Sequence, residues 1–246
     1  MSAYVFMPEK IRLDHLPAMV IFHGGGWTIG DPSWAFDSAE KYSKRNMVVI
    51  AAQYRLSDQK NVSPIDAVED ARDIIIWIRE NADELMIDTE KIVAYGWSAG
   101  AHLAASSAVF PAYNSDSTYS SIPDALILHS PALSVVNDGW FASLLPDGMK
   151  VIDLSPAENI DGAMPPSIIV VGRDDTVTPV EGSMLYHRNM IEQGNISHLN
   201  IYEDVGHMFT PSDQPDNEDP KPDRLVLSKA FDQVDLFLED LGYLNN

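Results

Sequence analysis

Residues 91–105 read KIVAYGWSAGAHLAA, in which a Gly-x-Ser-x-Gly turn joins two apolar runs. The first run, 91–95, is typical of a buried strand and the second, 101–105, of a helix. Gly96 and Gly100 lack the Cβ atoms that would collide in so tight a turn. A serine raised on such a turn stands clear of the sheet, at the positive end of the following helix. This stretch therefore predicts an α/β fold with Ser98 as a candidate nucleophile.

A second glycine-rich turn, His23-Gly24-Gly25-Gly26-Trp27, follows the apolar run 18–22. Three successive glycines leave backbone N–H groups uncovered, so a ligand can approach them closely. Fixed N–H donors of this kind stabilise the negative charge that develops on a carbonyl oxygen during acyl transfer. We expect the N–H groups of Gly25 and Gly26 to form such an oxyanion hole, with that of Ala99 as the third donor.

Two further polar turns follow strand-like runs, at 172–179 and at 206–207. The carboxyl ends of parallel strands meet at one edge of a sheet, which is where ligand sites form in open α/β sheets. His207 is therefore the candidate base. Three carboxylates compete as its partner: Asp174, Asp175 and Asp204.

The chain resembles, over nearly its whole length, the α/β-hydrolase esterases of the hormone-sensitive-lipase-like and acetyl-esterase type. The motifs that carry the resemblance are HGGGW at 23–27, YRL at 54–56, GWSAG at 96–100, GRDD at 172–175 and GHMF at 206–209. It implies an α/β-hydrolase fold, with a mostly parallel sheet of about seven strands flanked by helices, and a triad of Ser98, Asp175 and His207 in the family's chain order. The family pattern Gly-x-x-Asp favours Asp175 over Asp174, which is expected to cap a turn, and leaves Asp204 as the outside candidate.

The activity implied by this resemblance is hydrolysis of short-chain carboxylic esters, acetyl to butyryl, by a serine carboxylesterase that needs no metal or organic cofactor. Short acyl groups are expected because no long N-terminal cap and only a small lid are visible. Trp27 and Trp97 are expected to wall the substrate pocket. Arylformamidases share a similar HGG-x-W and GxSAGAH pattern, so formamide or amide hydrolysis by the same triad stays open. A more distant alternative is a non-catalytic ligand-binding relative.

The 246 residues fit a single domain, 1–246, in which strand-like runs alternate with the predicted helices 65–82 and 225–241. Residues 131–160 are too long for a plain connection, so we expect a crossover helix and a partial lid there. The apolar residues of this segment either line the substrate pocket or pack in the core: Trp140, Phe141, Leu144, Leu145 and Met149. His102 follows Ser98 by four residues on the same predicted helix and is expected to be structural.

The formal net charge is −21 and the chain has no cysteine. So acidic a surface disfavours nucleic acids and anionic membranes, and the expected partner is a small-molecule ester. The absence of thiols and of a visible signal peptide favours the cytoplasm, although the N-terminus is short enough to have been trimmed. The sequence is compatible with a monomer or a homodimer.

Overall fold

A seven-stranded sheet forms the centre of the molecule in the computed structural model, which describes residues 2–9, 15–58, 61–110, 117–215 and 219–244. The strands are β1 (Ala3–Phe6), β2 (Leu16–Phe22), β3 (Val48–Ala52), β4 (Ile87–Trp97), β5 (Ala125–His129), β6 (Ser167–Gly172) and β7 (Ser197–Tyr202). Their order across the sheet is β1-β3-β2-β4-β5-β6-β7, with β1 antiparallel to β3 and every other pair parallel. The strand number and mostly parallel pairing confirm the predicted fold class.

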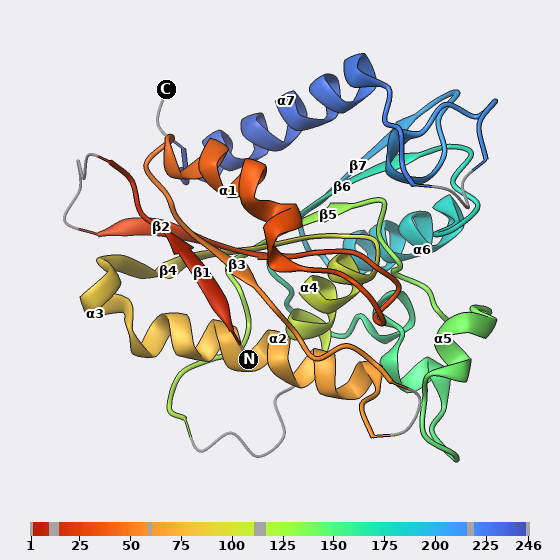
Figure 1. The fold of residues 1–246 in the computed structure, drawn as a ribbon, viewed down its shortest axis with the longest axis horizontal. Helices are drawn as coiled ribbons and strands as arrows, with labels where there is room; N and C mark the ends of the chain where they lie inside the picture. The colour runs from red at the N-terminus through yellow and green to blue at the C-terminus, as the bar shows by residue number, and fades with distance from the viewer. Residues whose placement is uncertain (1, 10–14, 59–60, 111–116, 216–218, 245–246) are drawn as a thin grey trace.

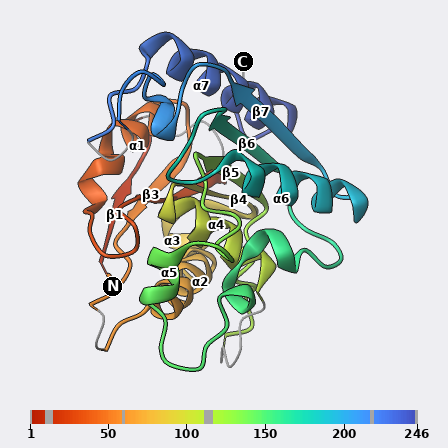
Figure 2. The ribbon, with the colours of Figure 1, turned by 90° about the vertical axis from the view of Figure 1, so that its right-hand side faces the viewer.

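Helices cover both faces of this sheet (Figures 1 and 2). The principal helices are α1 (Phe36–Ser43), α2 (Pro64–Glu80), α4 (Ala99–Val109), α6 (Val180–Glu192) and α7 (Arg224–Asp240). Helices α1 and α7 share one hydrophobic cluster with one face of the sheet, whereas α2, α4 and α6 share a second cluster with the other face. Strands β2, β3, β5 and β6 are buried along their whole length, which explains their continuous apolar sequences.

The two predicted helices lie close to their expected positions. Helix α2 begins at Pro64 after a capping box, in which the Ser63 side chain accepts from the Asp66 N–H and the Asp66 side chain accepts from the Ser63 N–H. Asp223 caps α7 by accepting hydrogen bonds from the N–H groups of Leu225 and Val226. Leu225, at the start of α7, is 65% exposed, and the buried residues of this helix begin at Ala230.

The segment 131–160, for which a crossover helix and a partial lid were predicted, contains one short helix and two 3₁₀ turns. These are α5 (Gly139–Ser143) and the 3₁₀ turns η2 (Val151–Leu154) and η3 (Pro156–Asn159). Phe141 and Leu144 are buried in the core, whereas Trp140 and Met149 are exposed. Core packing is therefore confirmed for Phe141 and Leu144, whereas a pocket-lining role for the others stays a prediction.

The remaining short elements are η1 (Pro32–Ala35), α3 (Ala82–Leu85) and η4 (His207–Phe209). The strand register aligns Phe22, Gly96 and Leu128 across β2, β4 and β5. The turns that leave these strands therefore start from the same edge of the sheet. Among the described helices, none combines the length and apolar character needed to cross a membrane.

Candidate active site

Ser98 occupies the turn between β4 and α4, with φ 54° and ψ −122°. This left-handed conformation is uncommon for a residue with a side chain and places its hydroxyl at the start of the helix. The turn is possible because both flanking glycines pack against backbone. A Cβ on Gly96 would overlap the carbonyl of Gly100, and a Cβ on Gly100 would overlap that of Phe22.

The three residues of the predicted triad lie together at this edge of the sheet. His207 Nε2 is 3.1 Å from Ser98 Oγ, and His207 Nδ1 is 2.9 Å from Asp175 Oδ2. Both His207 and Asp175 are buried. Neutral imidazole carries one N–H, so the tautomer protonated on Nδ1 donates to the carboxylate and leaves Nε2 free to accept from the serine.

The carboxylate of Asp175 is fixed by further donors from its own loop. Its Oδ1 accepts from the N–H groups of Val177 at 3.0 Å and Thr178 at 2.7 Å. The Thr178 hydroxyl lies 2.9 Å from Oδ2. These hydrogen bonds hold the carboxylate in the orientation in which it meets His207 Nδ1.

The two competing aspartates lie elsewhere. Asp174 is exposed and accepts a hydrogen bond from Ser212 Oγ at 2.6 Å. Asp204 is exposed in a left-handed turn after β7. The structure thus places Asp175, and not Asp174 or Asp204, beside His207.

The glycine-rich turn after β2 presents its N–H groups because its carbonyls are held from the other side. Gly25 O accepts from the N–H groups of Thr28 and Ile29, both at 3.1 Å, and Gly24 O lies 3.3 Å from the Tyr54 hydroxyl. In a trans peptide the N–H points opposite to the C=O, so the N–H groups of Gly25 and Gly26 face away from these contacts. Neither has a hydrogen-bond partner within the described part of the chain.

The third predicted donor, Ala99, is the first residue of α4, and the first N–H groups of a helix have no partner inside it. The positive end of the helix dipole adds to its attraction for an anion. Gly25 has φ 116° and Gly26 φ 55°, which only glycine adopts without strain. The glycines of this turn thus permit a backbone path that leaves these N–H groups exposed.

The structure places the two predicted pocket tryptophans differently from each other. Trp27 is only 3% exposed; its indole N–H donates to His102 Nδ1 at 3.3 Å, and its ring packs on Phe141. This residue therefore belongs to the core beneath the site, which corrects its expected role as a pocket wall. Trp97 is partly buried beside Tyr95, with its indole next to Gly24.

His102 has the structural role that the sequence predicted. Its Nε2 lies 2.8 Å from Leu154 O, and burial lowers its pKa to about 4. A neutral imidazole can then donate from Nε2 to Leu154 O while Nδ1 accepts from Trp27.

The sequence carries no signal for two residues of the site, Thr178 and Ser130, and leaves the role of a third, Trp140, open. Thr178 Oγ1 lies 3.2 Å from His207 Nδ1 and 2.9 Å from Ser130 O. Ser130 is buried with φ 41°, and its hydroxyl accepts from the N–H of Met208. It thereby links the loop of the acid to the loop of the base. The exposed indole of Trp140 donates to Gly26 O at 3.1 Å.

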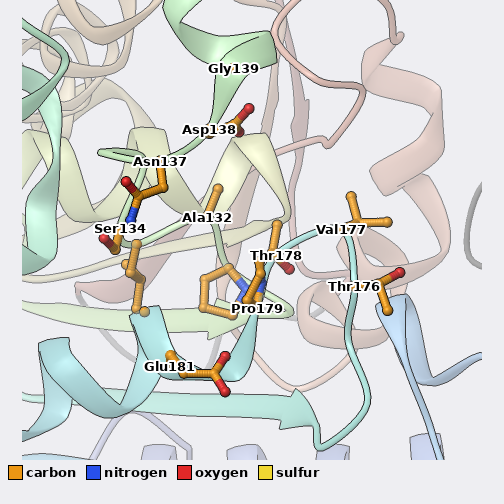
Figure 3. Close-up of a pocket in the computed structure, with 13 residues that line it drawn as sticks. Ala132, Ser134, Asn137, Asp138, Gly139, Thr176, Val177, Thr178, Pro179 and Glu181 are labelled. Carbon is orange, nitrogen blue, oxygen red and sulfur yellow. The ribbon is translucent and has the colours of Figure 1, made fainter.

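A cavity of about 330 Å³ lies between the segment after β5 and the acid loop (Figure 3). Asp138 and Gly139 border it on one side, and Thr176 to Pro179 on the other. Thr178 lines the cavity and also contacts Asp175 and His207. The cavity therefore adjoins the triad and has the volume of a small ligand pocket.

Comparisons with known proteins agree with this geometry. A family model described as BD-FAE matches residues 4–125. Carboxylesterase NlhH of Mycobacterium tuberculosis is 33% identical over 107 residues, which cover 41% of this chain and 31% of that protein. An arylesterase of Saccharolobus solfataricus is 30% identical over 129 residues, 50% of this chain and 41% of its own. The matched segments thus span less than half the length of these two relatives.

Solved structures of esterase 2 from Thermogutta terrifontis resemble the whole chain. The form phosphoramylated by tabun has a TM-score of 0.86 and 35% identity, with 99% of this chain and 90% of that chain covered. The propionate-bound form has a TM-score of 0.84 and 34% identity, with the same coverage. Similarity of this extent, together with the Ser98–His207–Asp175 geometry, shows that the chain belongs to the α/β-hydrolase esterases of the hormone-sensitive-lipase-like type.

Proposed function

We propose that this protein is a serine carboxylesterase that hydrolyses short-chain carboxylic esters through an acyl-enzyme. The observation that carries the proposal is the unbroken hydrogen-bonded line from Ser98 Oγ through His207 to Asp175. A serine hydroxyl is a weak nucleophile by itself and needs an adjacent base that is oriented by a third group. This arrangement supplies both.

In the first half of the reaction Ser98 Oγ attacks the ester carbonyl while His207 Nε2 takes the hydroxyl proton. The oxyanion forms beside the N–H groups of Gly25, Gly26 and Ala99. The bond to the alcohol oxygen then breaks, and His207 gives its proton to that oxygen as the alcohol leaves. Asp175 stays ionised throughout and stabilises the imidazolium.

In the second half, water replaces the alcohol. His207 takes a proton from the water as it attacks the acyl carbonyl, and returns the proton to Ser98 Oγ as the acid leaves. The same three N–H groups stabilise the second oxyanion, so each acts twice in one turnover. Loss of one such donor typically slows an enzyme of this kind by about 10²–10³-fold.

The preference for short acyl groups is supported by the relatives and by the cavity beside the triad. Thermogutta terrifontis esterase 2 has been solved with propionate and with butyrate bound. The cavity here, at about 330 Å³, lies at the lower end of the range for small-molecule pockets.

The test compares wild type with Ser98→Ala on p-nitrophenyl esters from acetate to laurate, with N-formylkynurenine as a formamide substrate. Ser228→Ala, an exposed position on α7, is the matched control. Turnover of acetate to butyrate esters that disappears only in Ser98→Ala supports the proposal. Paraoxon, which phosphorylates Thermogutta terrifontis esterase 2, is expected to inactivate wild type with one equivalent bound.

Three results would overturn this assignment in different ways. Turnover of the formamide alone assigns the triad to a formamidase. A preference for laurate over butyrate removes the short-chain part of the proposal. Folded wild-type protein that neither turns over any ester nor reacts with paraoxon is a ligand-binding relative.

A further inference from the structure

The side chain of Trp140 joins two segments that are 114 residues apart in the sequence. Its indole Nε1–H donates to Gly26 O at 3.1 Å, and this contact connects α5 to the glycine-rich turn after β2. The indole is nevertheless 49% exposed. Core packing does not explain an exposed tryptophan whose only polar side-chain atom donates to a backbone carbonyl of the glycine-rich turn.

Helix α5 holds this indole in a fixed place although the helix has only five residues. The Asp138 carboxylate accepts from the N–H groups of Trp140 and Phe141, at 2.9 and 3.0 Å, and so caps the helix. Phe141 is fully buried and packs on Trp27 and His102. The backbone of Trp140 is thus anchored to the core, and its indole lies against the glycine-rich turn.

The carbonyl that Trp140 holds differs from its neighbours in the same turn. Gly25 O is held from within the turn, and Gly24 O by Tyr54 of the adjoining strand end. Gly26 O has the indole N–H as its side-chain donor. Gly26 has φ 55° and no side chain, so its peptide planes rotate easily unless something fixes them.

Two peptide planes meet at the Gly26 Cα, and the Gly26 N–H belongs to the first of them, the Gly25–Gly26 peptide. The N–H donors to Gly25 O hold that plane, and the indole holds the second plane, the Gly26–Trp27 peptide, through Gly26 O. With the second plane also held, the Gly26 dihedral angles cannot turn freely, so the Gly26 N–H keeps its direction toward the site. A preorganised donor stabilises a developing charge far better than a donor that must reorient during the reaction.

We propose that Trp140 is a positioning residue of the oxyanion hole, which acts through the hydrogen bond from its indole to Gly26 O. This inference rests on the proposed esterase function. It makes the short α5 segment part of the catalytic apparatus: whatever moves α5 also changes the Gly26 donor. Trp140 itself need not touch the substrate for this effect.

Trp140→Phe tests the proposal because it keeps an aromatic ring and removes the N–H. We expect kcat to fall by about 3- to 30-fold, less than the 10²–10³-fold that loss of a whole donor costs, since Gly26 N–H is loosened and not removed. KM is expected to stay within about twofold, because the contact matters mainly in the transition state. The affinity of a phenylboronic acid, which places an oxygen anion in the hole, is expected to fall by the same factor as kcat/KM.

Two further variants separate positioning from packing. Replacement of Trp140 by β-(3-benzothienyl)alanine keeps the shape of the indole but puts sulfur in place of the N–H, so its kinetics are expected to match those of Trp140→Phe. Trp77→Phe, at a 37% exposed position on α2, is the control and is expected to leave kcat unchanged. Urea unfolding of each variant shows whether the fold is retained.

Unchanged kcat and boronic-acid affinity in the benzothienyl variant would overturn the inference, as would a change confined to KM. Failure of the proposed function is recognised separately. If Ser98→Ala is as active as wild type, the esterase assignment falls whatever the Trp140 variants do. If Ser98→Ala is inactive and the Trp140 variants equal wild type, only the positioning role falls.

Discussion

Two buried histidines are expected to make this protein unfold in mild acid. His102 is fully buried and His129 is 3% exposed. Burial lowers the pKa of His102 to about 4, against an opposing hydrogen bond to Leu154 O. Burial, followed by the nearby His207, lowers the pKa of His129 to about 3. Both histidines are therefore neutral in the folded protein at pH values where an unfolded chain would protonate them.

The sign and size of the effect follow from proton linkage. In the unfolded chain both side chains titrate near pH 6.5, so below that pH the unfolded state binds more protons and folding loses stability. The loss continues as pH falls until the folded pKa is reached. Between pH 6.5 and 4.5 each histidine costs about 2 kcal/mol, because one pH unit is worth about 1.4 kcal/mol once the unfolded side chain is fully protonated. Together they cost about 4 kcal/mol, a large part of the whole stability of many domains.

His129→Phe isolates one of these contributions. The imidazole stacks on Phe209 with ring centroids 4.7 Å apart, and its Nε2 has no hydrogen-bond partner within the described residues. A phenyl ring keeps the stacking and cannot be protonated. We expect the free energy of unfolding to change little at pH 7.5, and its loss from pH 7.5 to 4.5 to be smaller than in wild type by about 2–3 kcal/mol.

The assay is urea unfolding followed by circular dichroism at several pH values, with His15→Gln as the control. His15 is exposed, so its replacement is expected to leave the acid sensitivity unchanged. The reasoning is refuted if His129→Phe loses as much stability as wild type between pH 7.5 and 4.5. In that case His129 is protonated in the folded state at pH 4.5, or its burial is relieved before the protein unfolds.

Three further predictions concern contacts that stabilise the fold, two of them next to the site. Thr178→Val removes a hydroxyl that contacts Asp175 and a buried carbonyl, and is expected to lower stability by about 1–3 kcal/mol and kcat about tenfold. Thr178→Ser keeps the hydroxyl and is expected to match wild type in both thermal unfolding and ester assays. Gly100→Ala is expected to cost about 3 kcal/mol or more in urea unfolding, since its Cβ would overlap the backbone carbonyls of Phe22 and His23. Gly139→Ala, with open space around the Cβ, is expected to be neutral. Arg79→Met removes hydrogen bonds to three backbone carbonyls and to the Asp124 carboxylate. The expected loss of stability is about 2–3 kcal/mol, which lowers Tm by about 4–12 °C, and an unchanged Tm would contradict this prediction.

The parts of the fold that the sequence predicted are those in which local chemistry leaves few alternatives. Gly96 and Gly100 flank Ser98 because no Cβ fits at either position, and residue type alone predicts this tight turn. The buried strands could be predicted because a strand covered on both faces is a nearly continuous apolar run, as in Val48–Ala52. In both cases the local requirement excludes most other residues.

The segment 131–160 was predicted less well, because an apolar residue does not indicate what it packs against. Trp140 and Phe141 are adjacent and both aromatic, yet Trp140 is half exposed against the glycine-rich turn after β2 and Phe141 is fully buried. The same limitation explains Trp27, whose position beside the glycines suggested a pocket wall. Its left-handed backbone, φ 63°, turns the indole into the core toward His102.

Backbone strain in this protein collects where the chemistry is proposed to occur. Within the described residues, eight side-chain-bearing positions have positive φ, and six of them lie in turns after the strand ends that carry the site: Trp27, Ser98, Ser130, Asp204, Met208 and Phe209. Such conformations cost about 1–3 kcal/mol each for residues with side chains, and they persist only where surrounding contacts enforce them. Here the buried strands and the hydrogen bonds of Ser130 enforce them. Apart from Asp204, these residue types are uncommon in left-handed turns. Residue type alone therefore predicts the glycines of the site and Ser98 between two of them, but not the strain at Ser130, Met208 or Phe209.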